Sequence, residues 1–285
     1  MKYFKKSYFL LVLVFVLSSC LKELSLENNG KPVATQNCKI QKLIQADPNT
    51  GNSEYAYIST YDSSNLTLNI QLIDSSVNTI DAYFPISYST GKVQVDADQF
   101  FLVGSDGRVT QFHGYEYPED NTSQMLTAKY TYNSAGQLVK RTEEYDTLPG
   151  VVTFQMDYIY SSNNLIRADI SYNLGAAFAK IAEVTYEYDA SKTIKNFLFL
   201  HALGRELSYF QTAVNAGTNS TNPVNKATVE VLDPNTGGTN TFVTNFVNYS
   251  INSNNYVESF ELTGDDFDVA GLNSGKRYIL DYSCL

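Results

Sequence analysis

One motif, a pair of tyrosines separated by a single residue, occurs three times and constrains the fold more than any other feature. The copies begin at Tyr130, Tyr158 and Tyr186, so neighbouring copies lie 28 residues apart. A polar residue follows each pair directly, and an aliphatic residue follows a few positions later. Equal spacing at this period indicates one supersecondary unit copied along the chain. Each copy is expected to form a strand, a tight polar turn and a second strand.

Side chains around the first tyrosine pair alternate between two faces. Leu126, Ala128, Tyr130 and Tyr132 share one face, whereas the intervening threonine and lysine side chains share the other. A strand sends successive side chains to opposite faces, so this alternation predicts a sheet with two unlike sides. Residues 133–136 then supply an asparagine and a glycine, which favour a turn. Connections this short join antiparallel neighbours, because parallel strands need a long crossover.

Segments with the same alternation continue from Cys38 to the end of the chain. If successive segments pair as hairpins, they give about 14 to 16 strands. The further candidates are 39–45, 54–61, 66–72, 80–86, 93–103, 108–117, 224–232, 240–251, 256–263 and 276–283. The rhythm breaks once, where large apolar residues recur every three or four positions from Phe197 to Val214. That period predicts a helix near 196–213. The predicted fold class is therefore all-β, an antiparallel up-and-down meander with one helical insertion.

The first 19 residues are predicted to be a lipoprotein signal peptide and not part of the fold. Three lysines precede an apolar run from Phe9 to Leu17, which is shorter than the roughly 20 residues of a membrane-spanning helix. The sequence Leu17-Ser18-Ser19-Cys20 resembles the lipobox of bacterial lipoproteins. The resemblance implies cleavage before Cys20 and acylation of that cysteine; an ordinary secretory signal is the alternative. Residues 20–37 would form a flexible tether and residues 38–285 a single domain.

The charge balance argues against one class of partner. The chain carries 30 acidic residues against 20 lysines and arginines, a formal charge of −10. Nucleic acid requires a basic surface, so no nucleic-acid partner is expected. Membrane attachment is expected through Cys20, because multiple acyl chains anchor a protein stably without help from charge. The expected location is the outer membrane, with the domain facing the periplasm or the cell exterior.

Two cysteines, Cys38 and Cys284, stand at the two ends of the predicted domain. An exported protein meets oxidising conditions, so the two are expected to pair. A disulfide requires Cα atoms within about 7 Å, and this bond would place the first and last strands side by side and close the sheet. Two buried free thiols are the alternative, because cysteine is a common core residue.

The repeated unit Tyr-x-Tyr-Asn/Asp-x-x-Gly-x-Leu resembles the tyrosine–aspartate repeats of bacterial surface and toxin-shell proteins. The whole layout resembles an uncharacterised family of bacterial lipoproteins with a porin-like fold: a lipobox, a cysteine at each end of the domain, tyrosine-rich hairpins and a helical interruption before Asn222-Pro223. The resemblance implies a closed or nearly closed barrel-like sheet, and it implies no activity and no catalytic residues. Ser161, which follows Tyr160, departs from the repeat.

Residues that could support catalysis or bind a metal are scattered along the sequence. The candidates are His113, His201, Asp47, Asp233, Asp265, Asp266 and Asp268. The two histidines are expected to pack as ordinary side chains, since no metal-spaced cysteine or histidine accompanies them. The first two aspartates open Asp-Pro-Asn-Thr-Gly turns, and the last three lack the spacing of a calcium loop. No cofactor, metal site or enzymatic activity is expected.

Three functional classes remain open. The first, which we favour, is a lipid-anchored cell-envelope protein of unknown biochemical activity that binds a glycan or peptide or serves as a scaffold. The second is a glycan-acting hydrolase that uses strand carboxylates, with Glu143, Glu144, Asp157 and Asp169 as candidates. The third is an integral outer-membrane barrel, which charged strand residues such as Arg141 disfavour, because a lipid-facing side must be apolar.

Overall fold

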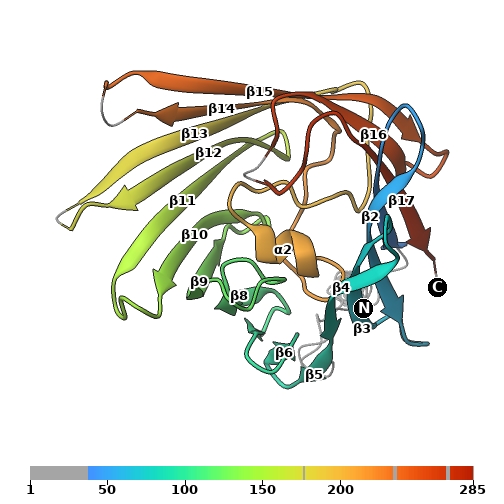
Figure 1. The fold of residues 1–285 in the computed structure, drawn as a ribbon. Coiled ribbons are helices and arrows are strands. Elements are labelled where there is room, and N and C mark those ends of the chain that lie inside the picture. The colour runs from blue at the N-terminus through green and yellow to red at the C-terminus, as the bar shows by residue number, and fades with distance from the viewer. Residues whose placement is uncertain (1–37, 176, 234–235, 268–269, 285) are drawn as a thin grey trace, which may run out of the picture.

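The computed structural model describes residues 38–175, 177–233, 236–267 and 270–284. In this part of the chain 17 strands form one antiparallel sheet, and a short helix, α2, follows strand β13 (Figure 1). The all-β prediction is confirmed. The predicted signal peptide 1–19, the tether 20–37 and the acylation site Cys20 lie outside the described residues.

Most strand bounds agree with the alternating segments of the sequence to within a few residues. The strands are β1 (Lys39–Ala46), β2 (Ser53–Tyr61), β3 (Thr67–Asp74), β4 (Thr79–Pro85), β5 (Ser87–Ser89), β6 (Lys92–Gln94), β7 (Phe100–Val103), β8 (Val109–Tyr115), β9 (Met125–Tyr132), β10 (Leu138–Tyr145), β11 (Val152–Ser161), β12 (Asn164–Asn173), β13 (Phe178–Tyr188), β14 (Val224–Leu232), β15 (Thr239–Ile251), β16 (Val257–Gly264) and β17 (Arg277–Ser283). The candidate strand 93–103 is divided into β6 and β7, because residues 95–99 bend the chain between them.

The sheet forms a nearly closed barrel. Strands that follow one another in the chain are paired around the ring, and β1 also pairs with β17. At one seam the ring continues by a change of partner, since β4 pairs with β3 whereas β5, the next segment, pairs with β6. Pro85 ends β4 at this seam. Proline is tolerated at this edge because it has no N–H to donate to a neighbouring strand.

A disulfide joins the two ends of the ring. Cys38 and Cys284 lie 4.2 Å apart at Cα, and their sulfurs are bonded. Pairing of the adjacent strands starts with Lys39 opposite Ser283 and continues along the whole of β1. The predicted bond and the predicted contact between first and last strands are both confirmed.

The barrel has two unlike ends. One end carries Cys38 and Cys284 and the tight turns of the repeats, such as residues 133–136, and is called the cysteine end. The other end is called the mouth; because strands alternate in direction, the β10–β11, β12–β13 and β14–β15 hairpins all turn there. These hairpins project to the left in Figure 1, away from the C-terminus.

The segment between β13 and β14, residues 189–223, folds into the barrel and is called the plug (Figure 1). Its two ends meet at the cysteine end, where Asp189 and Ile194 donate backbone hydrogen bonds of 3.0 and 2.9 Å to Pro223 and Thr221. The plug side chains pack against the inner faces of the strands and form one continuous apolar core with them. The barrel interior is therefore filled by the chain itself.

The predicted helix over 196–213 is wrong in extent, because α2 spans only Arg205–Phe210. Every side chain from 197 to 202 is buried in the barrel. The apolar spacing in that stretch therefore reflects burial on all sides and not the single apolar face of an amphipathic helix. Leu203, with φ of 58°, turns the chain in the left-handed region just before α2 begins.

Candidate binding site between the plug and the barrel wall

The first tyrosine of each repeat faces the interior and holds the plug. Tyr158 and Tyr186 donate hydrogen bonds to the plug carbonyls of Ala202 and Leu200, both at 2.8 Å. Both tyrosines are buried, so the hydroxyls need these partners. The motif that specifies the hairpins therefore also supplies the hydrogen bonds that fix the plug. Sequence analysis placed the tyrosines correctly on one face but did not predict what they bind.

A buried charge cluster surrounds Tyr130, the first tyrosine of the first repeat. Tyr130 donates a 2.6 Å hydrogen bond to Glu206 of α2, and Arg141 donates to both oxygens of that carboxylate at 2.9 and 3.0 Å. Arg141 also pairs with Glu143 on its own strand. Burial raises the pKa of Glu143, although the guanidinium acts in the opposite direction. The cluster ties α2 to β9 and β10 within the core.

His201 lies in the plug and is 2% exposed. Its Nε2 shares a 2.5 Å hydrogen bond with the hydroxyl of Tyr160, and its ring stacks on Phe199 with centroids 3.9 Å apart. Burial lowers the pKa of His201 to about 3, so the imidazole is neutral at pH 7. The ring therefore serves as a packed, hydrogen-bonded part of the plug.

The four candidate carboxylates are not brought together. Glu143 faces the interior, whereas Glu144, Asp157 and Asp169 are partly exposed. Asp157 and Asp169 are direct cross-strand partners on β11 and β12. The ion pairs of the three exposed carboxylates are Lys129–Glu144 at 3.9 Å, Lys140–Asp157 at 3.4 Å and Lys180–Asp169 at 2.6 Å. These carboxylates therefore belong to an ion-paired outer surface.

The other candidate residues stabilise turns and strand edges. Their hydrogen bonds join His113 Nδ1 to Thr127 (3.2 Å), Asp47 to the amides of Asn49 and Thr50 (2.8 Å each), Asp233 to the hydroxyl of Thr236 (2.8 Å), Asp265 to the amide of Val243 (2.7 Å) and Asp266 to the amide of Ser274 (2.6 Å). Asp268 lies outside the described residues. Among the residues that the structure describes, no three His, Cys, Asp or Glu side chains are grouped so as to hold a metal ion.

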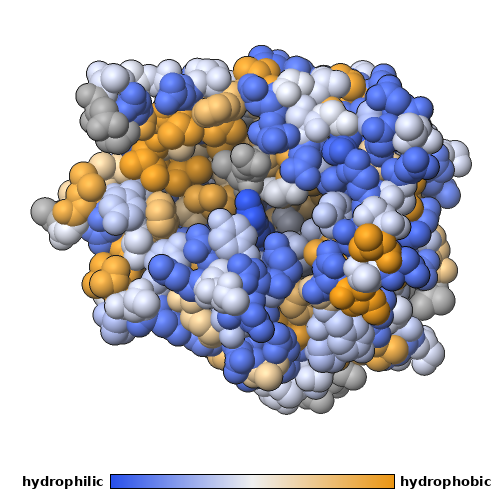
Figure 2. Space-filling model, in the orientation of Figure 1, coloured by the Kyte–Doolittle hydropathy of each residue, from blue (hydrophilic) through white to orange (hydrophobic). Residues whose placement is uncertain are grey.

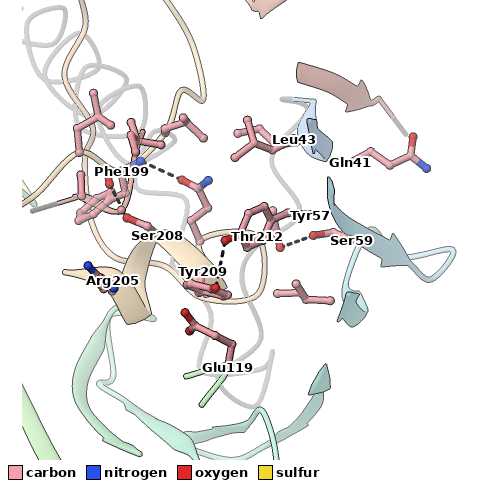
Figure 3. A pocket seen from close by; sticks show the side chains of 18 residues that line it. Gln41, Leu43, Tyr57, Ser59, Glu119, Phe199, Arg205, Ser208, Tyr209 and Thr212 are labelled. Atoms are coloured by element: carbon pink, nitrogen blue, oxygen red, sulfur yellow. Dashed lines mark hydrogen bonds between the residues drawn. The ribbon is translucent and has the colours of Figure 1, made fainter. Parts of the chain in front are cut away.

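A cavity of about 130 Å³ lies between the plug and the wall formed by β1, β2 and β3 (Figure 3). Its aliphatic lining comes from both sides: Ile40, Leu43 and Ile70 from the strands, and Leu198, Leu200 and Leu272 from the plug and the β16–β17 loop. Its polar lining includes Tyr57, Ser59, Ser208, Tyr209 and Thr212, with Glu119 and Arg205 also on its surface. The cavity is thus mainly apolar and carries a few converging polar groups.

Four of the hydroxyl groups of the cavity are already paired with one another, and that of Ser208 donates to the carbonyl of Phe199 at 2.7 Å. Tyr57 donates to the hydroxyl of Tyr209 at 3.1 Å, and their rings meet edge to face at 5.1 Å. Ser59 and Thr212 share a hydrogen bond of 2.9 Å. Burial raises the pKa of Tyr57 to about 12 and raises that of Tyr209 as well, so both phenols are neutral. A ligand here would meet aliphatic walls, aromatic rings and uncharged hydroxyls, together with the charged side chains of Glu119 and Arg205.

This cavity could not be predicted from the sequence. Its lining comes from β1, β2, β3, the β8–β9 loop, the plug and the β16–β17 loop. The alternating pattern of the strands indicates which residues share a face, but no local pattern reports the fit between plug and wall. A cavity of this kind depends on contacts between segments that are distant in the sequence.

The fold is similar to solved structures of porin-like proteins. A porin-like protein from Bacteroides vulgatus ATCC 8482 matches with a TM-score of 0.55 and 14% identity over 87% of this chain and 100% of that chain. One from Bacteroides uniformis ATCC 8492 matches with a TM-score of 0.54 and 10% identity, over 86% and 96% of the two chains. At these identities the likeness concerns the fold alone, and it agrees with the barrel-like architecture. No family model and no curated protein matches the sequence.

The structure TcdB2-TccC3-TEV overlaps 73% of this chain but only 9% of its own chain, with 11% identity and a TM-score of 0.34. An overlap at that score supports no conclusion about the tyrosine repeats.

Among the described residues, no helix has the length and apolar character needed to cross a bilayer.

Proposed function

We propose that this chain is a cell-envelope binding protein, anchored to a membrane through acylated Cys20, that holds a small apolar or aromatic ligand in the cavity beside the plug. The supporting observation is a cavity of about 130 Å³ between the plug and the barrel wall. An apolar cavity of about 150 Å³ is sufficient to bind benzene or xenon. The volume therefore favours a single ring or a short alkyl chain over the glycan or peptide expected from the sequence.

The arrangement of the ends agrees with such an anchor. Cys20 precedes Cys38 by 18 residues, and Cys38 lies at the cysteine end of the barrel. A tether of that length reaches about 60 Å when fully extended. It would join the barrel at the cysteine end, which is opposite to the mouth.

The outer face of β10 to β13 supports an anchored domain over an integral barrel. Its ion pairs include Lys140–Asp157 and Lys180–Asp169, with side chains between 21% and 46% exposed. Charged groups facing the middle of a bilayer cost about 2 to 4 kcal/mol each. These strands are therefore better suited to water than to lipid.

Labelling with an alkyne analogue of palmitate tests the anchor. We expect the wild-type chain to incorporate the label and to sediment with membranes, and the Cys20→Ser variant to do neither. A Ser18→Ala variant, which keeps the cysteine, is expected to behave as the wild type. If the Cys20→Ser chain still sediments with membranes although it carries no palmitate label, the proposed anchor is contradicted.

Ligand-detected NMR with indole and 4-methylphenol tests the cavity, using the full chain with Cys20→Ser. We expect saturable binding that raises the unfolding temperature, because a ligand bound only by the folded state stabilises it. Leu43→Phe adds volume at the cavity wall and is expected to weaken binding by about tenfold or more. Leu68→Phe makes the same change at a site that is 49% exposed and should leave binding intact. Equal affinity in both variants would place the bound probe elsewhere.

A further inference from the structure

An exposed apolar strip lies inside the mouth, on the opposite wall from the cavity. Its five members, one from each of the adjacent strands β11 to β15, are Phe154, Tyr172, Ile181, Val231 and Phe242, and they are called the inner strip. Phe242 is 44% exposed, Tyr172 38% and Val231 36%. Figure 2 shows this region as a hollow apolar area at the left of the molecule. Exposed apolar surface gathered in one place marks an interaction site more often than scattered residues do.

The strand register, together with the core contacts of Phe154 and Ile181, shows that the inner strip faces inward. Phe154 is two residues from fully buried Met156, and its ring lies 5.2 Å from that of its cross-strand partner Tyr172. Phe242 is the partner of Val229, whose side chain is buried in the core. Side chains two residues apart on a strand share a face. The inner strip is therefore the continuation of the core surface beyond the part that is covered.

Among the described residues, the segments inside the barrel leave the ends of these strands at the mouth uncovered. Phe267 of the β16–β17 loop is fully buried against Tyr186 and Phe246, with ring centroids 6.1 and 5.9 Å apart. Beyond that contact, β14 carries Val231 and β15 carries Phe242, and both side chains are exposed. The hollow is thus open toward the mouth and closed toward the plug.

Across β11 to β14 the backbone around the inner strip offers no free edge to an extended peptide, and only β15, from Thr239 to Phe242, lacks a ladder partner on one side. Strands β12, β13 and β14 are each paired on both sides, so their N–H and C=O groups are used in ladders. A peptide laid across this face would leave its own backbone groups unpaired, which is costly. A hydrocarbon chain has no such groups. Five neighbouring strands span about 19 Å, a length suited to a long linear chain.

The charges nearest to the inner strip disfavour an anionic head group. Glu143 is the cross-strand partner of Phe154. Burial and the neighbouring carboxylates of Glu143 and Glu116 raise the pKa of Tyr145 at the same end of the barrel. Arg141 neutralises one carboxylate here, and the whole chain carries a charge of −10. A head group with negative charge would be repelled, whereas a neutral or cationic one would not.

We propose that the inner strip binds the hydrocarbon chain of an amphiphile whose head group is uncharged or cationic. The chain crosses β11 to β15 inside the mouth, and the head group lies toward β8 to β10. This site is separate from the cavity beside the plug and does not depend on a ligand being bound there. It faces the end of the barrel opposite to the tether.

Equilibrium dialysis below the micellar concentration tests the proposal, using the full chain with Cys20→Ser so that no acyl group of its own competes. The probes are palmitoylcholine, monopalmitin and palmitate, which carry the same chain on cationic, neutral and anionic head groups. We expect saturable binding of one palmitoylcholine or one monopalmitin per chain. We expect palmitate to bind more weakly than either, by about tenfold or more. Stronger binding of palmitate than of the other two, or no saturable binding of any, would overturn the proposal.

Paired substitutions separate the inner strip from other apolar surface. Phe242→Ser is expected to weaken binding by about tenfold or more, and Leu232→Ser, which is also 44% exposed but points outward from the neighbouring strand, is expected to leave it unchanged. Val231→Ser and Ile166→Ser, at 36% and 37% exposure, repeat the comparison with a smaller change. Equal losses within each pair would assign the binding to general surface apolarity. A wild-type dimer that Phe242→Ser dissociates would instead make a second copy the occupant.

Discussion

A single guanidinium holds two buried carboxylates inside the barrel. Arg141 is 2% exposed, and Glu143 and Glu206 are 8% and 4% exposed at their side chains. Removing one member of a buried ionic group costs more than the group contributes, because the remaining charges lose their partner. The energetic role of this cluster therefore depends on Arg141.

We predict that Arg141→Met lowers the free energy of unfolding by about 3 to 5 kcal/mol, since it leaves two carboxylates buried without a cation. Glu206→Gln is expected to cost less, because Arg141 then keeps Glu143 as a partner. Urea unfolding followed by circular dichroism measures both. A smaller loss for Arg141→Met than for Glu206→Gln would show that the guanidinium is not the centre of the cluster.

We predict that the free energy of unfolding depends on pH through the buried side chain of His201. The pKa of its imidazole is lowered from 6.5 to about 3 in the folded chain by burial. Between these values the unfolded state binds a proton that the folded state does not, so stability falls as the pH is lowered. The slope from one such group is at most about 1.4 kcal/mol per pH unit. Urea unfolding between about pH 6.5 and pH 5, above the range of most carboxylates, isolates this contribution.

The variant His201→Gln is expected to remove that slope, because glutamine does not titrate and can still accept a hydrogen bond from Tyr160. Tyr160→Phe retains the histidine and should retain the slope. If the wild type and His201→Gln lose stability in parallel over this range, another group is responsible.

At the residue scale, the sequence predicts which face a side chain takes but not its distant partner. Glu143 and Glu144 are adjacent, and the period of a strand places them on opposite faces, as observed. The partner of Arg141, however, is Glu206, which is 65 residues away in the plug. Nothing in the local pattern around either residue indicates that contact.

At the scale of elements, the repeated hairpin serves both as wall and as holder of the plug. Tyr158 and Tyr186 each bind a plug carbonyl, whereas the hydroxyl of Tyr132 is buried and has no hydrogen-bond partner among the described residues. The repeat therefore contains its own control, because one tyrosine of the motif lacks the interaction that others make.

We predict that Tyr158→Phe and Tyr186→Phe each lower the free energy of unfolding by about 1 to 2 kcal/mol, since each leaves a buried carbonyl unpaired. Tyr132→Phe keeps the ring and removes only a hydroxyl without a partner, so it should be neutral or slightly stabilising. Thermal and urea unfolding of the three variants provide the comparison. A loss for Tyr132→Phe as large as for the other two would contradict this assignment of roles.

The hairpins could be predicted from sequence because alternation and turn residues are local properties. The plug could not, because its apolar residues are buried on all sides and carry no face-specific pattern. Its spacing of three and four resembled a long helix, yet only Arg205–Phe210 is helical. Packing inside the barrel, and not local helix propensity, determines the conformation of the plug.

At the scale of the whole molecule, the disulfide closes a loop that contains nearly the entire domain. Cys38 and Cys284 are separated by 246 residues. In the chain-entropy account, a crosslink of that span destabilises the unfolded state by about 5 kcal/mol. We predict that Cys38→Ser with Cys284→Ser lowers the free energy of unfolding by up to about that amount while β1 and β17 remain paired. Urea unfolding with and without reductant measures it; an unchanged midpoint for the wild type under reductant would contradict the prediction.

Ring closure could be predicted from the sequence because two cysteines mark the ends of the domain. What fills the interior of the ring could not be predicted. The sequence alone left open whether the sheet encloses a channel, a cavity or packed side chains. The structure shows packed side chains over most of its length, with the cavity beside Leu43 and Tyr57 and the inner strip as the parts left open.

The pairing of β1 with β17 also means that the order of the strands around the ring does not depend on where the polypeptide begins. Joining residues 38 and 284 by a short peptide and cutting the chain at an exposed hairpin would give a circular permutant with every strand contact preserved. The barrel is in this sense a cycle, and β1 is only its present starting point.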